Sequence, residues 1–264
     1  MNAFEALVLG MIQGLAEWLP ISSTGHLVLA EEFLGLPARE NLLFDLVLHL
    51  GTLLAVCLYF RRELTKIVAS MLVEKSRRTP DILALRMLGS LLLIGTAPIA
   101  IVGILLTDRM EDIFNPVVVG AALIANAGLL FLAERIGAKG TRRNAKLVDA
   151  IVIGIFQAVA IIPGISRSGS TLSGGMFRGL EREMAATFGF LLSVPALIGA
   201  FAYGAITLDH YDADLLMLGI GFFAALLMGL ASIEYLLKAV RSGKLWVFSV
   251  YCAIVGAAAI VLWI

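Results

Sequence analysis

Six long apolar stretches constrain this chain more than any other feature of its sequence. A helix that crosses a lipid bilayer needs about 20 mainly apolar residues. Stretches of this kind occupy residues 42–60, 84–106, 116–133, 183–206, 215–237 and 246–264. Of the 264 residues 60% are hydrophobic and only 15% are charged, whereas a soluble domain carries roughly 25% charged residues. The sequence therefore predicts an all-α polytopic membrane protein.

Two further apolar stretches, 4–19 and 148–162, are shorter than a full span. Each runs into a proline, Pro20 or Pro163, and then into a turn rich in serine and glycine. Backbone that breaks inside a membrane must be buried in protein or line a wet cavity, so such segments tend to mark functional sites. We expect each stretch to begin a re-entrant helical hairpin.

The basic residues predict how the chain is oriented in the membrane. They concentrate in three connections, within 61–78, 135–146 and 238–244, whereas the connections 107–115 and 207–214 are acidic and hold only Arg109. Connections rich in Lys and Arg face the cytoplasm. Six spans then place both termini outside, and the first hairpin enters from the outer face of the membrane.

An internal repeat relates the two halves of the chain. Residues separated by 144 positions match at several points: Gly10 and Gly154, Gln13 and Gln157, Ala16 and Ala160, Ser22 and Ser166, Gly25 and Gly169, Gly35-Leu36 and Gly179-Leu180, Phe44 and Phe188. We interpret 1–264 as a single membrane domain of two repeats, about 1–140 and 145–264, each with one hairpin and three spans. An odd number of crossings inverts the second repeat relative to the first, which brings the two hairpin tips together near the midplane.

The first hairpin carries an acid, hydroxyls and a histidine within one short segment. Gln13 and Glu17 share one helix face, and a carboxylate at membrane depth needs a cation or a donor nearby. Ser23 and His26 lie three residues apart, on nearly the same side of the next helix. Ser22, Ser23 and Thr24 also suit the cap of that helix, where free N–H groups attract phosphate. Glu17 at the wet end of its helix and a purely structural His26 are the plainer alternatives.

The second hairpin has the composition of an anion-binding site. Glycines and hydroxyls at a helix start form a nest of backbone donors, and Arg167 adds a planar fork that suits two phosphate oxygens. Ser166, Ser168 and Thr171 surround it. A salt bridge between Arg167 and Glu17 alone would leave most of these donors unused. Asp45, His49 and Asn126 lie within spans, where hydrogen bonds between helices are the commoner role, although Asp45 could reach the cavity.

The two halves together supply what phosphoryl transfer needs: a nucleophile, a base and charge stabilisation. A transporter or flippase of a lipid phosphate is the main alternative, because inverted repeats with broken helices are also a transporter architecture, and a lipid-binding scaffold is a third. The residues alone do not choose between Ser23, Thr24 and water as the attacking group. Zero formal net charge gives no reason to expect nucleic acid as a partner.

At this point the sequence resembles the undecaprenyl-diphosphate phosphatase family, the bacitracin-resistance type of membrane phosphatase. The resemblance covers essentially the whole chain and rests on two motifs, QGLAEWLPISSTGH at 13–26 and PGISRSGST at 163–171. It implies removal of the terminal phosphate from undecaprenyl diphosphate, which recycles the lipid carrier of peptidoglycan synthesis, with Mg²⁺ or Ca²⁺ assisting. The family's first acidic position is Glu or Gln, and here it is Gln13, which leaves one fewer carboxylate for a metal.

The resemblance also implies roles for the matching residues. Ser23 would be the nucleophile, His26 its base or the acid for the leaving group, and Glu17 a metal ligand or orienting carboxylate. Arg167 would bind the diphosphate; its helpers in substrate binding would be Ser166, Ser168, Thr171, Thr24 and Gln13. We expect a multi-pass protein of the bacterial plasma (inner) membrane whose site opens to the outer face. Bacitracin would compete for the substrate rather than bind the protein, and a homodimer is the oligomer that we consider.

Overall fold

The computed structural model describes residues 1–36, 42–74, 76, 78–106, 114–207 and 214–264. Most of the two acidic connections and the basic residues Lys75 and Arg77 therefore lie outside the described residues. The described part contains 11 α-helices, one short 3₁₀ helix and, apart from an isolated bridge between Arg142 and Leu180, no paired strand. The all-helical class that the sequence predicts is confirmed.

Five helices are long and apolar enough to cross a membrane. They are α5 (Pro80–Leu106), α7 (Pro116–Ile136), α10 (Arg182–Thr207), α11 (Leu215–Arg241) and α12 (Leu245–Trp263). A sixth candidate is the pair α3 (Leu42–Tyr59) and α4 (Arg61–Leu72), which are bent by 80° at their junction. The six predicted spans fall on α3, α5, α7, α10, α11 and α12, so the protein has the helices of a multi-pass membrane protein.

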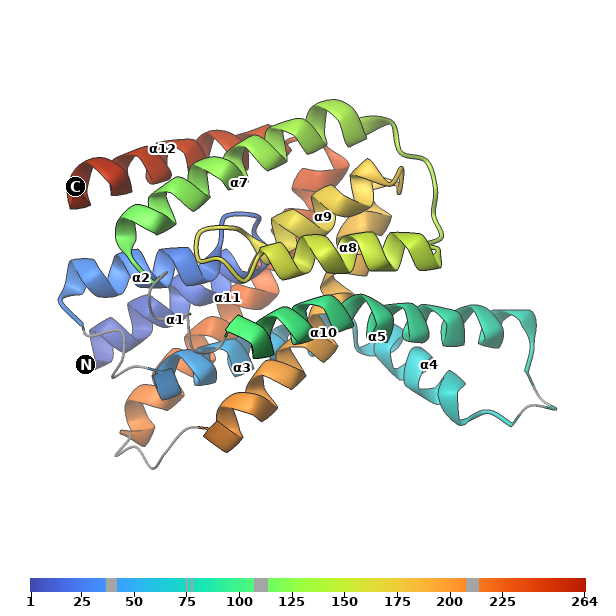
Figure 1. The fold of residues 1–264 in the computed structure, drawn as a ribbon. Helices are drawn as coiled ribbons and strands as arrows, with labels where there is room; N and C mark the ends of the chain where they lie inside the picture. The colour runs from blue at the N-terminus through green and yellow to red at the C-terminus, as the bar shows by residue number, and fades with distance from the viewer. Residues whose placement is uncertain (37–41, 75, 77, 107–113, 208–213) are drawn as a thin grey trace.

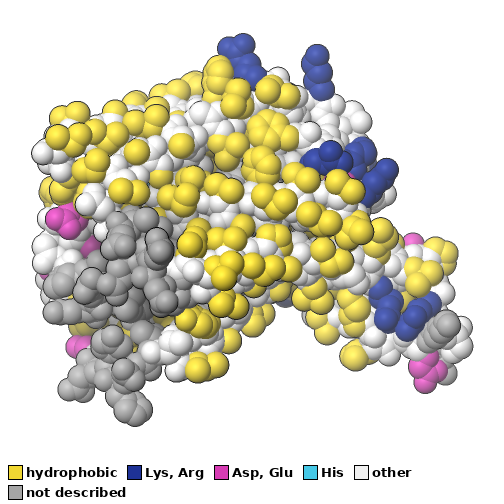
Figure 2. Space-filling view, in the orientation of Figure 1, with side chains coloured by type: hydrophobic (Ala, Val, Ile, Leu, Met, Phe, Trp, Pro, Cys, Tyr) yellow, Lys and Arg dark blue, Asp and Glu magenta, His cyan; other side chains and the backbone are white. Residues whose placement is uncertain are grey.

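The surface of the molecule fits a lipid environment. Large apolar side chains such as Leu93, Ile104, Phe223 and Leu262 are well over half exposed, and Figure 2 shows hydrophobic side chains spread across the face in view. Lys and Arg gather at the top and right of this view, away from the end that holds both termini in Figure 1. In water such a surface would be unfavourable, whereas against lipid tails it costs little.

The two predicted hairpins are formed by pairs of short helices. α1 (Ala3–Trp18) is followed by α2 (Ser23–Leu34), and α8 (Leu147–Val159) by α9 (Arg167–Phe177). α2 and α9 both begin after a serine cap, because the hydroxyls of Ser22 and Ser166 accept from the N–H groups of Gly25 and Gly169. These caps satisfy backbone donors that a helix start leaves free.

Close backbone contacts hold the hairpin helices against the spans. A Cβ at Gly10 of α1 would lie 2.5 Å from the Gly221 carbonyl oxygen of α11, and a Cβ at Gly154 of α8 would lie 2.4 Å from the Gly95 carbonyl oxygen of α5. Only glycine allows such approaches. The turns after α1 and α8 lie side by side in the middle of the molecule (Figure 1), where they position the polar side chains described next.

Candidate active site

The tips of the two hairpins touch each other, through a close approach of their backbones and through hydrogen bonds between serine hydroxyls and backbone groups. A Cβ at Gly25 would lie 3.0 Å from both N and Cα of Gly164. The Gly164 N–H donates to the Ser22 hydroxyl at 3.1 Å. The Ser168 hydroxyl donates to the Leu19 carbonyl at 3.0 Å. Segments from opposite halves of the sequence therefore form one structural unit.

Asn126 of α7 fixes this arrangement from a third helix. Its amide nitrogen donates to the Pro20 carbonyl at 2.9 Å, and its amide oxygen accepts from the Ser166 N–H at 3.1 Å. The side chain is 1% exposed, so both bonds are protected from water. The prediction that Asn126 forms hydrogen bonds between helices is confirmed. The nitrogen of its amide bonds to the first hairpin, and the oxygen bonds to the second.

Ser22 has an unusual backbone conformation. Its φ of 72° makes it the one non-glycine residue with positive φ in the part of the chain that the structure describes. Such a conformation costs on the order of 1–3 kcal/mol and persists where the surroundings impose it, often at functional sites. Here it turns the chain from α1 into α2 and brings Ser23 back toward Glu17.

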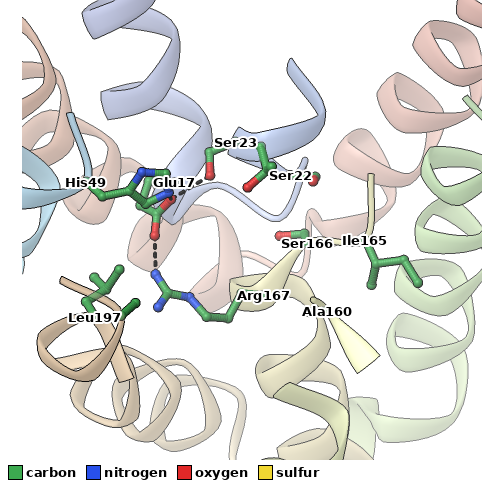
Figure 3. A pocket seen from close by; sticks show the side chains of 11 residues that line it. Glu17, Ser22, Ser23, His49, Ala160, Ile165, Ser166, Arg167 and Leu197 are labelled. Carbon is green, nitrogen blue, oxygen red and sulfur yellow. Dashed lines mark hydrogen bonds and ion pairs between the residues drawn. The ribbon is translucent and has the colours of Figure 1, made fainter. Parts of the chain in front are cut away.

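A cavity of about 170 Å³ lies between the hairpins. One part of its wall is polar and comes from both hairpins and α3; it consists of Glu17, Ser22, Ser23, Thr24, His49, Ser166 and Arg167. The other part is apolar and comes from the turn after α8 and from α10; it consists of Ala160, Ile165, Leu197 and Ala200. Figure 3 shows the Glu17 carboxylate between Ser23 and Arg167, with His49 beside it.

Glu17 is the centre of the polar contacts. One carboxylate oxygen, Oε1, accepts from the Arg167 guanidinium. The other, Oε2, accepts from the Gln13 amide at 2.9 Å and from the Ser23 hydroxyl at 2.5 Å. The Glu17 side chain is 4% exposed and that of Arg167 17%. The pairing joins the first hairpin to the second and compensates a carboxylate that could not otherwise be buried.

The structure does not place His26 with this group. Its Nδ1 lies 2.8 Å from the Ser22 carbonyl oxygen and its Nε2 lies 2.8 Å from the Tyr251 hydroxyl. Because a carbonyl only accepts, Nδ1 carries the hydrogen and Nε2 accepts from the tyrosine. The ring also stacks on Tyr251 of α12, with an interplanar angle of 10°. The expectation that His26 and Ser23 point to the same side is wrong, since the intervening turn of α2 aims the imidazole at α12.

His49 of α3 occupies the place that sequence reasoning gave to His26. Its Nδ1 lies 2.8 Å from the Asp45 carbonyl oxygen, so this nitrogen donates, and its Nε2 lies 3.9 Å from Oε2 of Glu17. His49 lines the cavity, and the Asp45 side chain is not part of the lining. A histidine in the middle of a span was the available signal, but nothing in the sequence indicated which helix α3 faces.

Two residues that were predicted to help bind the substrate, Thr171 and Ser168, do not line the cavity and contact residues that do. The Thr171 hydroxyl donates to the Arg167 and Ser168 carbonyls of its own helix. The Ser168 hydroxyl lies 3.0 Å from that of Ser166. Ser166 and Thr24 line the cavity, and Gln13 touches it through Glu17. Ser166 and Ser168 therefore lie next to Arg167 and Thr171 bonds to the first turn of α9, whereas the substrate-binding roles of these residues stay predictions.

The donor set does not fit a resident Mg²⁺ or Ca²⁺. Ca²⁺ takes six to eight oxygen ligands, and Mg²⁺ is held by one or two carboxylates together with waters and substrate phosphates, so either ion needs a carboxylate that is free to bind it. Glu17 is the only carboxylate of the cavity lining, and its oxygens are engaged by Arg167, Gln13 and Ser23. No group of three or more His, Cys, Asp or Glu residues suited to a metal occurs among the described residues. The expected role of Glu17 as a metal ligand has no support in this arrangement.

Fold and site together define a class: a multi-pass helical membrane protein with a buried, amphipathic cavity built around an arginine, a carboxylate and serine hydroxyls. Comparison with known proteins is more specific. The bacitracin resistance protein BacA family matches residues 6–258, and the chain belongs to this family.

Full-length relatives carry one name. A protein of Carboxydothermus hydrogenoformans, named undecaprenyl-diphosphatase, is 41% identical over 99% of this chain and 98% of its own length. Proteins with the same name from Methanosphaera stadtmanae and Korarchaeum cryptofilum are 36% and 39% identical, over 99% and 98% of this chain and 98% of each relative.

Proposed function

We propose that this protein is an undecaprenyl-diphosphatase, which hydrolyses the terminal phosphate of the C55 prenyl diphosphate and so recycles the lipid carrier of peptidoglycan synthesis. The hydrogen bond from Ser23 to Glu17, beside the Arg167 guanidinium, is the observation that carries the proposal. It combines an activated hydroxyl with a phosphate-binding cation in one cavity, and the names of the relatives agree with it. Bacitracin resistance would follow because the drug competes for the same lipid.

Glu17 is the proton acceptor in the proposed mechanism. As Ser23 Oγ attacks the terminal phosphorus, its proton passes to Oε2 of Glu17, which already accepts it in a hydrogen bond of 2.5 Å. The bond between the terminal phosphorus and the bridging oxygen breaks, and prenyl phosphate leaves. The oxygen of a water then attacks the phosphoserine phosphorus and the bond between phosphorus and Ser23 Oγ breaks; Glu17 returns its proton to Oγ, and the phosphate leaves as H₂PO₄⁻ with both protons of the water.

Arg167 changes partner in this proposal. In the structure the guanidinium bonds to Oε1 of Glu17. A diphosphate carries more negative charge than one carboxylate, so it attracts the guanidinium, assisted by the α9 N-terminus and the Ser166 hydroxyl. Loss of the Arg167 contact makes Glu17 a stronger base at the moment when the substrate is in place.

Thr24 and water are the alternative attacking groups, and Ser23 is favoured by its contact. Thr24 lines the cavity, but the hydroxyl that bonds to Glu17 belongs to Ser23. The catalytic role expected for His26 stays a prediction. Its contacts support a positioning role instead, because its Nδ1 bonds to the carbonyl of the strained residue Ser22. Mg²⁺ or Ca²⁺ stays an expectation from the resemblance, and no step is assigned to it.

We also propose the inverted repeat, as one membrane domain with repeats at about 1–140 and 145–264 and with re-entrant α1–α2 and α8–α9 hairpins. Equivalent contacts support it. α1 packs on α11 through Gly10 and Gly221, and α8 packs on α5 through Gly154 and Gly95. Gly10 and Gly154 are a matching pair of the sequence repeat, and so are Ser22 and Ser166, which cap their helices in the same way.

The proposed location is the bacterial plasma membrane, with both termini outside and the site open to the outer face. Both termini lie at one end of the molecule, and the α4–α5 and α7–α8 connections at the other (Figure 1). To test the side of opening, Thr24→Cys in intact cells should react with a membrane-impermeant maleimide more than the parent chain does. Reaction only after permeabilisation would show that the cavity opens to the cytoplasm.

Phosphate release by the purified protein tests the proposed activity. The detergent-solubilised protein should release phosphate from a prenyl diphosphate, and Ser23→Ala should abolish this release. Ser249→Ala, which removes a buried hydroxyl on α12 bonded to the Ala127 carbonyl, is a control expected to retain it. Binding of the lipid without turnover by the parent protein would instead indicate a transporter or a scaffold.

A further inference from the structure

The cavity has an apolar wall that the proposed reaction does not use. Ala160 and Ile165 belong to the turn between α8 and α9, and Leu197 and Ala200 belong to α10. In Figure 3 Leu197 lies on one side of Arg167, and Ala160 and Ile165 lie on the other. A site for inorganic phosphate alone would gain nothing from such a wall, whereas a ligand with a charged head and an apolar tail requires both kinds of surface.

The wall on α10 leads from the interior to the surface. Leu197 is 6% exposed, whereas Ala200, one turn further along the same face, is exposed. Because Ala200 both lines the cavity and is exposed, α10 is open to its surroundings beside the cavity, and for a spanning helix these surroundings are lipid.

The packing of α5 against its neighbours is closer at Gly95 than at Gly103. A Cβ at Gly95 would lie 3.0 Å from Leu192 of α10 and 3.1 Å from the Ala150 carbonyl oxygen of α8, so the three helices meet there. Two turns later, at Gly103, a Cβ would have one neighbour within 4 Å among the described residues outside its own helix backbone, Ile161 Cδ1 at 3.8 Å. α5 and α10 cross and then separate toward their C-terminal ends (Figure 1).

We propose that Leu197 and Ala200 bind the first isoprene units of the prenyl chain, and that the small side chain at position 200 allows the chain to pass from the cavity into the bilayer. This inference rests on the proposed function, since the diphosphate would occupy the polar wall. The prenyl chain then leaves the cavity sideways, between the outer parts of α5 and α10. Beyond this point it contacts lipid rather than protein, so the site does not limit the length of the chain. Position 200 is thus a specificity-determining position for the presence of a tail.

We call position 200, where the prenyl chain would leave the cavity, the mouth of the cavity. A bulky side chain at the mouth should obstruct the prenyl chain, and binding of substrate analogues with and without a tail tests this. Ala200→Trp is compared with Ala202→Trp, which adds the same ring to an exposed alanine of the same helix that does not line the cavity. The probes are the non-hydrolysable farnesyl methylenediphosphonate and tail-free methylenediphosphonate. We expect Ala200→Trp to weaken binding of the farnesyl probe at least about tenfold, with tail-free binding within about twofold of the parent protein, and Ala202→Trp to change neither.

The outcomes separate this inference from the proposed function. Equal affinity of the parent and Ala200→Trp for the farnesyl probe would overturn the assignment of the mouth, as would an equal loss for both probes. Release of phosphate from farnesyl diphosphate by the parent protein is measured in the same preparation. Tight binding with the expected discrimination but without any phosphate release would leave the mouth in place and reject the phosphatase.

Discussion

The Ser23 hydroxyl donates to the Glu17 carboxylate over 2.5 Å, across the break between α1 and α2. The two residues belong to different helices, and only the strained turn at Ser22 brings them into contact. This bond identifies one hydroxyl among three neighbouring candidates and one base for it. The first two predictions concern these two groups.

Ser23→Ala should lower kcat for phosphate release by at least about 10³-fold, because the covalent route is removed. Thr24→Ala is the matched control, since it deletes a hydroxyl from the same cavity wall without touching Glu17, and we expect it to retain activity within about tenfold. Phosphate release from a prenyl diphosphate is measured for both. Similar kcat values for Ser23→Ala and the parent would point to direct attack by water.

Glu17→Gln should lower kcat by roughly 10²–10⁴-fold, the usual contribution of a general base, whereas His26→Gln should lower it about tenfold or less. The glutamine at position 26 retains a donor for the Ser22 carbonyl, which is the contact that the imidazole makes. Full pH profiles of kcat are recorded for both variants. A larger loss in His26→Gln, together with a missing limb of its profile, would return the catalytic role to His26.

Arg167→Ala should destabilise the protein by about 3 kcal/mol, because it leaves the buried Glu17 carboxylate without its cation. The double variant Arg167→Ala, Glu17→Gln removes the unpaired charge and should regain most of that stability, yet stay inactive. Unfolding in detergent micelles and phosphate release are followed side by side. Additive losses of stability in the double variant would show that the two residues do not depend on each other.

Asn126→Leu should cost about 1–3 kcal/mol, because it leaves the buried Ser166 N–H without its partner and leaves the Pro20 carbonyl with only the weak thiol contact of Cys252. It should also lower activity, since both hairpin tips lose a common anchor. Ser249→Ala removes one buried hydrogen bond to the same helix α7, at the Ala127 carbonyl, and should affect stability only. Unchanged activity in Asn126→Leu would mean that the hairpins hold each other without α7.

The environment of Asp149, at the end of the molecule where Lys and Arg gather, predicts that the folded protein loses stability in acid. Burial raises the pKa of this carboxyl, but hydrogen bonds from Arg142, the Lys146 N–H and Arg178 outweigh burial and bring the pKa to about 2. In the unfolded chain the pKa of an Asp is about 3.9. The stabilisation is therefore complete above about pH 4 and disappears as the pH falls through about 2.

Its size is on the order of 1–2 kcal/mol, because Arg142 and Arg178 are partly exposed and solvent screens their attraction for the carboxylate. Unfolding between pH 2 and pH 6 measures it. Asp149→Asn should remove this part of the pH dependence while leaving the rest of the curve. An identical pH dependence in Asp149→Asn and the parent would show that Arg142 and Arg178 do not stabilise the ionised carboxyl.

The sequence alone determined the class of fold and most of the polar residues that meet at the cavity. Apolar stretches of about 20 residues have few alternatives to membrane-crossing helices, because in lipid every backbone polar group must be satisfied within the chain. Gln13, Glu17, Ser23 and Arg167 were recognisable because acids, hydroxyls and an arginine are costly in apolar segments and so mark a cavity. The constant offset between the matching residues of the two halves likewise depends on local pattern alone.

Only the tertiary structure decided which of the two histidines, His26 of α2 or His49 of α3, lines the cavity. Both His26 and His49 lie in apolar helices, and local pattern does not show which neighbour each helix face contacts. α2 follows the turn with a φ of 72° at Ser22, and its His26 contacts Tyr251 on α12, the last helix of the chain. The packing of α3 brings His49 to Glu17. The exposed Ala200 at the mouth was equally invisible, because an alanine carries no signal until the space around it is known.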